Sequence, residues 1–144
     1  MTVAQRQAEL IGEYLIIEHA LERFQVILDT FPGRAAEYPK HWRDADHFVP
    51  GCTSAVWLAV WATSPGILAV RVAAEAPSLA AIGALFSLIY DGGSAGEIMA
   101  VEPEFLKALG IDRQLTPTRR RGLGFLRDRI VAAARAEEMA GRDA

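Results

Sequence analysis

Cysteine is nearly absent from this chain, which has one, Cys52, among 144 residues. A lone thiol excludes an internal disulfide, so we expect the protein to belong to a reducing compartment. Any chemistry that oxidises the sulfur of Cys52 must therefore be completed by a thiol of another molecule.

The chain also has no excess of basic residues and no long apolar run. Fifteen basic and eighteen acidic residues give a net charge of −3, which disfavours binding to nucleic acid or to an anionic membrane. The longest apolar stretch, Leu79 to Tyr90, has 12 residues, whereas a membrane span needs about 20. The first residues lack the basic and apolar blocks of a signal peptide. We therefore expect a soluble, cytoplasmic protein.

The chain is long enough, and at 51% hydrophobic residues apolar enough, for one domain over residues 1–144. Apolar residues at steps of three and four predict a single helix from about Ala4 to Asp29, which Pro32 and Gly33 end. Residues 34–47 have little periodicity, so we expect a loop with one short helical turn. The predicted inward residues of the first helix are Leu10, Tyr14, Ile17, Leu21, Phe24 and Leu28.

Residues 56–63 and 67–75 are rich in β-branched and aromatic side chains and are separated by the turn residues 64–66, Ser-Pro-Gly. This pattern predicts an antiparallel hairpin. Leu68, Val70 and Val72 alternate with smaller or polar residues, so we expect one face to be covered by helices and the other to meet solvent.

Helix signals dominate the rest of the sequence. Pro77-Ser78 opens a long apolar helix that residues 91–93 end, and residues 94–97 have the spacing of a capping box. A short helix is predicted over residues 102–109, and Thr116-Pro117 opens a final helix to about Met139. The predicted inward residues of that last helix are Leu123, Leu126, Ile130 and Ala134. The fold class is α+β, with helices on a small antiparallel sheet.

Cys52 follows Pro50-Gly51, which together turn the backbone and present the next side chain on a loop. A lone cysteine is usually a small buried hydrophobe, but this position favours a thiol that is available for chemistry. The aromatic residues Phe48, Trp57 and Trp61 could shelter a modified sulfur, although we expect aromatic residues beside a strand to be plain core.

Arg119, Arg120 and Arg121 begin the last helix, where the exposed amides already create positive potential and acids are the usual residues. One interpretation is a solvated cluster. The other is a site for an anion or a thiolate, because guanidinium groups near Cys52 would lower the pKa of its thiol.

Two motifs resemble one known family. Residues 49–58, VPGCTSAVWL, are similar to the signature loop V-x-G-C-x-S-x-V-W of the SufE family of sulfur-acceptor proteins. Residues 115–123, LTPTRRRGL, resemble that family's segment L-(S/T)-P-(S/T)-R-x-x-G-L, and residues 89–91 and 97–98 fall between them in the family's order. The similarity covers about residues 21–136.

The resemblance implies an α+β fold with about three strands, and an accessory protein without stand-alone enzymatic activity. Cys52 would accept persulfide sulfur from a pyridoxal-phosphate-dependent cysteine desulfurase, stimulate that enzyme and supply scaffold proteins of iron–sulfur cluster assembly. Arg119, Gly51, Ser54 and Trp57 would bind the partner or stabilise the anion. The resemblance implies no cofactor and no metal site in the protein itself.

Departures from the family pattern leave the sulfur donor open. His47 stands where the family usually has asparagine, and Ala55 where it often has glutamine. Both fall around the presumed docking surface, so a rhodanese-type sulfurtransferase is the alternative donor.

Other cysteine chemistries fit less well. A phosphatase loop needs arginine at position 58, which is Leu58, and a rhodanese-type loop wants arginine or glycine within residues 53–57, which have neither. The three histidines and Cys52 lack the spacing of metal ligands. The remaining alternative is an interaction module that has kept the fold and lost the chemistry.

Overall fold

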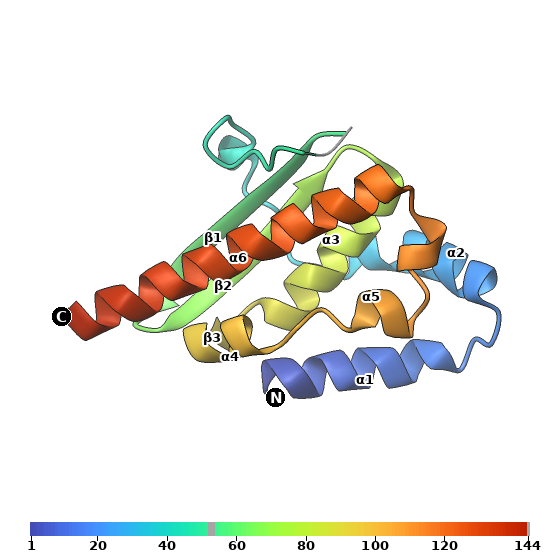
Figure 1. Ribbon diagram of the computed structural model, residues 1–144, viewed down its shortest axis with the longest axis horizontal. Helices are drawn as coiled ribbons and strands as arrows, with labels where there is room; N and C mark the ends of the chain where they lie inside the picture. Colours follow the sequence, from blue (N-terminus) through green and yellow to red (C-terminus); the bar gives the residue numbers. More distant parts are fainter. Residues whose placement is uncertain (52–53, 144) are drawn as a thin grey trace.

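The computed structural model describes residues 1–51 and 54–143, which form six α-helices, three short 3-10 helices and one three-stranded antiparallel sheet. This arrangement confirms the predicted α+β class (Figure 1). The α-helices are α1 (Val3–Leu15), α2 (Ala20–Thr30), α3 (Pro77–Tyr90), α4 (Ala95–Ala100), α5 (Phe105–Ala108) and α6 (Pro117–Asp143). The strands are β1 (Val56–Ser64), β2 (Ile67–Ala74) and β3 (Gly93–Ser94), and the 3-10 helices are η1 (Phe31–Gly33), η2 (Lys40–Trp42) and η3 (Asp112–Gln114).

The hairpin of β1 and β2 forms as the alternation predicts. Leu58 lies opposite Val72 and Val60 opposite Val70, so these side chains share one face. That face packs against α3 and α6, and in Figure 1 α1 lies on the side of α3 away from the hairpin. A Cβ at Gly83 of α3 would lie 2.6 Å from Cγ1 of Val72, so this glycine lets α3 approach β2 closely.

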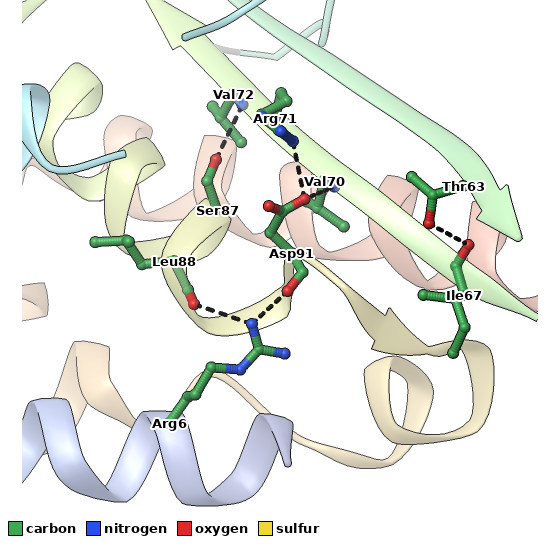
Figure 2. A network of polar contacts seen from close by, with 9 residues as sticks. All are labelled: Arg6, Thr63, Ile67, Val70, Arg71, Val72, Ser87, Leu88 and Asp91. Carbon is green, nitrogen blue, oxygen red and sulfur yellow. Dashed lines mark hydrogen bonds and ion pairs between the residues drawn. The ribbon is translucent and has the colours of Figure 1, made fainter. Parts of the chain in front are cut away.

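Side chains from the end of α3 complete the outer edge of β2 (Figure 2). The amide of Val70 donates to Oδ1 of Asp91 at 2.9 Å, and the amide of Val72 donates to Oγ of Ser87 at 3.2 Å. Arg71 also donates to Oδ1 of Asp91, at 2.9 Å. These bonds occupy the amides that an edge strand would otherwise offer to another chain.

The second face of the hairpin is less open than the alternation predicts. Tyr38 and Trp42, from the loop before β1, cover Ala59 and Ala73, which are buried. The Tyr38 hydroxyl donates to the carbonyl of Trp42 at 2.7 Å, and burial raises its pKa to about 12. The expectation that this face meets solvent is therefore wrong where the loop with Tyr38 and Trp42 folds back over it.

The predicted single helix over residues 4–29 is wrong, because the chain breaks between α1 and α2. Arg23 is buried and donates to the carbonyls of Tyr14, Ile17 and Leu109 at 3.2, 3.0 and 2.8 Å. These carbonyls lie at or just after the C-terminal ends of α1 and α5, so one side chain of α2 binds two other helices. Leu21, a predicted inward residue, is instead 61% exposed.

The C-terminal helices follow the sequence more closely. The capping box of Ser94 and Glu97 is formed in both directions. The helix α5 is shorter than the predicted span of residues 102–109, and α6 continues beyond Met139. Its four predicted inward residues are all buried. Among the described residues no helix is both long and apolar enough to cross a membrane.

Candidate functional site

The segment before the loop is anchored to the outer edge of β1. The amide of Val49 donates to the carbonyl of Val56, and the amide of Leu58 donates to the carbonyl of His47, both at 2.8 Å. Phe48 forms an isolated antiparallel bridge with Trp57. The loop therefore leaves the sheet at Pro50. The candidate acceptor Cys52 lies outside the described residues, as does residue 53.

Gly51 is held in a conformation that favours glycine. Its φ is +95°, which side chains rarely adopt, so the sharp turn expected at Pro50-Gly51 is confirmed. A Cβ at this position would also lie 2.4 Å from both Cδ2 and Cε2 of Phe125, on α6. Glycine is thus required twice here, by the turn and by the ring that lies against it.

An apolar hollow opens beside Gly51. It has a volume of about 470 Å³ and is lined by two loop residues and by one side of α6. Phe125 forms its main wall and is 40% exposed, an unusual position for an aromatic ring that does not face the core. The lining residues are Pro50, Gly51, Phe125, Asp128, Arg129 and Ala132.

The far end of the loop is bonded to the turn just before the start of α3. The carbonyl of Ala55 accepts the amide of Glu75 at 3.1 Å, just before β1 begins. Ser54, the residue before it, is half-buried. The loop thus starts against α6 and ends beside the turn between β2 and α3.

Arg119 reaches that same helix start. Its amide donates to Oγ1 of Thr116 at 3.3 Å, which bears out the predicted cap of α6. Its Nη1 donates to Oγ of Ser78, in the first turn of α3, at 2.7 Å. Arg120 instead donates to the carbonyl of Asp112 at 3.1 Å. Arg119 and Arg120 therefore have separate contacts, and of these two only Arg119 is directed to α3.

Trp57 lies on the other face of the sheet. It alternates with Val56 and Leu58, which face the helices, and its ring packs edge-on to Phe48 at 6.4 Å. The guanidinium of Arg43 lies 5.4 Å from the centre of the Trp57 ring. Of the residues predicted for the site, Gly51 contacts α6 and Arg119 contacts α3, whereas Trp57 points away from both.

The histidine near the loop makes local contacts. Nδ1 of His47 lies 2.7 Å from Oδ1 of Asp44, and its ring stacks on Trp42 with centres 5.1 Å apart. The hydrogen bond from the His47 side chain is the largest of the causes that lower the pKa of Asp44. Within residues 1–51 and 54–143 no group of three or more potential ligands is placed to hold a metal ion.

The sequence pattern did not point to two residues of this region, Phe125 and Ser78. Phe125 carries a faint signal, since a large apolar residue beside the inward Leu126 widens the apolar stripe of α6 towards solvent. Ser78 carries none, because a serine in the first turn of a helix is ordinary.

These features define a class: an α+β protein that holds a glycine-turn loop between its long C-terminal helix and the start of its central helix. The chain belongs to the SufE family, whose sequence model, described as an Fe-S metabolism associated domain, matches residues 8–134. The family places the chain among accessory proteins of sulfur transfer.

Known relatives agree with this assignment. Uncharacterized SufE-like proteins from two strains of Mycobacterium tuberculosis are each 26% identical to the chain over 126 residues, which cover 85% of this chain and 87% of the relative. The solution structure of a hypothetical protein from Thermus thermophilus has the same fold. It matches with a TM-score of 0.72 at 21% identity, and the match covers 93% of this chain and 96% of that one.

Proposed function

We propose that the protein is a sulfur acceptor that takes persulfide sulfur on Cys52 from a cysteine desulfurase, stimulates that enzyme and passes the sulfur on for iron–sulfur cluster assembly. The observation that carries the proposal is the family match across residues 8–134 together with a single cysteine in the signature loop. The hollow beside Gly51 supports it, because an apolar wall next to the loop would protect a transferred sulfur from thiols in water.

The transfer step needs no oxidant. The Cys52 thiolate attacks the terminal sulfur of the donor's persulfide, a new sulfur–sulfur bond forms at Cys52, and the donor's sulfur–sulfur bond breaks. The donor leaves as a thiolate, and the proton stays on the transferred sulfur or is released. A chain with one cysteine has no internal thiol to displace that sulfur, so it persists until the next acceptor arrives.

The other site residues receive roles that match their positions. Gly51 allows the turn that presents the loop, and Arg119 stabilises negative charge on sulfur or on the donor. Ser54 extends the docking surface at the end of the loop, and Trp57 supports the strand that carries the loop by packing against Phe48 on the other face of the sheet.

Mass spectrometry of the protein after incubation with a desulfurase and cysteine tests the proposal. We expect a gain of about 32 Da on Cys52, the mass of one sulfur atom. Cys52→Ser, which preserves the size of the side chain without the nucleophile, should bind the donor and gain no mass. Full stimulation of the desulfurase with Cys52 unmodified would refute the carrier role.

The donor itself is tested by offering each candidate separately. A purified desulfurase and a purified rhodanese-type sulfurtransferase, each loaded with persulfide, are mixed with the protein in a single turnover. We expect rapid transfer to Cys52 from the desulfurase and slow transfer from the rhodanese, because the family match is to iron–sulfur metabolism. The reverse order of rates would assign the rhodanese as donor.

A further inference from the structure

Arg119 occupies an electrostatically unfavourable place. It lies in the first turn of α6, and its guanidinium reaches the first turn of α3, so it meets the positive ends of two helices. Among the described residues it forms no ion pair with a carboxylate. A cation held there without a counter-charge is suited to receive an anion from outside the protein.

Ser78 is the side chain that holds the guanidinium in this place. Its hydroxyl accepts one N–H of Arg119 at 2.7 Å, and both residues are partly buried. An arginine has five N–H donors, so one neutral contact fixes the group and leaves its charge and its other donors free. A carboxylate in place of Ser78 would neutralise that charge, whereas a hydroxyl only orients it.

No local structural role accounts for the hydroxyl of Ser78. The cap residue of α3 is Ala76, which makes no side-chain cap bond, and Pro77 follows it, so Ser78 lies beyond the capping position. The hydroxyl contact that the structure gives Ser78 is the one with Arg119, 41 positions along the chain. Its contribution to the fold is therefore this one hydrogen bond between α3 and α6.

We propose that Ser78 is a positioning residue for sulfur transfer: its hydroxyl orients Arg119 at the start of α3, three positions after Glu75, whose amide donates to the carbonyl of Ala55 at the end of the cysteine loop. This inference rests on the proposed function. It assigns to α3 a part in transfer that neither signature motif contains, because Ser78 lies between residues 49–58 and 115–123.

The test measures single-turnover sulfur transfer from a persulfide-loaded desulfurase to Cys52, with the acceptor concentration varied. We expect Ser78→Ala to lower the rate at saturating acceptor by about threefold to tenfold, and Ser78→Thr, which keeps the hydroxyl, to restore it. Arg119→Ala should lower it further. The double variant should equal Arg119→Ala alone, because Ser78 acts through that arginine.

Ser87→Ala is the matched control on the same helix, since the Ser87 hydroxyl accepts the amide of Val72 and supports only the sheet edge. It should lower the denaturation midpoint and leave transfer unchanged. Ser78→Ala with a wild-type transfer rate, or with losses that multiply with those of Arg119→Ala, would overturn the inference. A wild-type protein that gains no sulfur on Cys52 would instead defeat the proposed function, and the inference with it.

Discussion

Gly51 illustrates how much one residue can decide in this protein. Its positive φ turns the chain away from β1, and its missing Cβ makes room for the ring of Phe125. The backbone requirement is local and the ring requirement is tertiary, and both act on the residue directly before Cys52. A substitution here would disturb the loop without touching the thiol.

We predict that Gly51→Ala lowers the free energy of unfolding by about 1–3 kcal/mol, because alanine must adopt a left-handed conformation and also displace the Phe125 ring. Urea denaturation of the purified variant measures the loss. In a Phe125→Ala background the ring is absent and the clash is removed. Gly51→Ala should then lower the free energy of unfolding by less than it does in the wild-type protein. If the urea midpoint of Gly51→Ala equals that of the wild type, neither the positive φ nor the Phe125 ring constrains this position.

At the scale of elements, buried polar side chains add hydrogen bonds between helices that also pack through the hydrophobic core. Arg23 binds carbonyls near the ends of α1 and α5, and Arg127, buried on α6, donates to the carbonyl of Ile98 of α4 at 2.8 Å. The carbonyls in the last turns of these helices thereby gain side-chain donors. Helix C-termini also carry negative potential, which compensates the buried guanidinium of Arg23, whereas Arg127 also pairs with Glu102 at 4.0 Å.

Arg23→Ala should therefore be strongly destabilising, by about 3 kcal/mol or more, since several buried carbonyls lose their donors together. The control is Arg34→Ala, because Arg34 is partly exposed and pairs with Glu13 at 3.5 Å across an exposed surface. That variant should change stability by less than about 1 kcal/mol. Equal losses for the two variants in thermal or urea unfolding would contradict the role given to Arg23.

Glu97 links α4 to α1 and makes stability depend on acidity. Hydrogen bonds, the largest from the backbone of Ser94 and another from the amide of Val3, lower the pKa of Glu97 from its ordinary value of 4.5. A carboxyl group whose pKa is lowered by folding stabilises the fold above its unfolded pKa, and this contribution is lost as the pH falls through the folded pKa.

Glu97→Gln should accordingly be less stable than wild type at pH 7, and the difference should shrink in acid, below the ordinary pKa of 4.5. Urea denaturation of both proteins across this range gives the comparison. A difference that stays constant from neutral to acidic pH would show that the carboxylate charge contributes nothing through these hydrogen bonds.

For the whole molecule, the fold brings both ends of one loop to different helices. The hairpin provides a rigid edge, α6 lies against Gly51, Ala55 is bonded to Glu75 just before α3, and Arg119 is bonded to the first turn of α3. The aromatic cluster of Trp42, Trp57 and Trp61 stabilises the opposite face of the sheet. A carrier and a pure interaction module could share this architecture, so the thiol itself must be tested.

Alkylation of Cys52 makes that distinction. A carrier should lose all stimulation of the desulfurase once the thiol is blocked, because the nucleophile is gone, while its circular dichroism and unfolding midpoint stay unchanged. Cys52→Ser treated with the same reagent controls for modification elsewhere. An interaction module would retain its stimulation after alkylation, and that result would favour the alternative to sulfur transfer.

The sequence by itself determined the features that depend on neighbours along the chain. The alternation of residues 56–63 and 67–75 specified the hairpin, the Ser94 and Glu97 spacing specified a capping box, and Pro50-Gly51 specified a turn. The family motifs added the assignment of Cys52 as the candidate acceptor. Each of these signals lies within about twenty consecutive residues, so local geometry is enough to produce it.

Only the tertiary structure decided the contacts that bridge distant segments. Arg23 and Leu109 are 86 positions apart and Arg119 and Ser78 are 41 apart, and no periodicity links such pairs. The apolar spacing continues across the break between α1 and α2, so the pattern does not reveal it. The buried Arg23 binds carbonyls at this break and also the carbonyl of Leu109. The ring of Phe125 against Gly51 was equally hidden, since packing places it where a Cβ would otherwise lie.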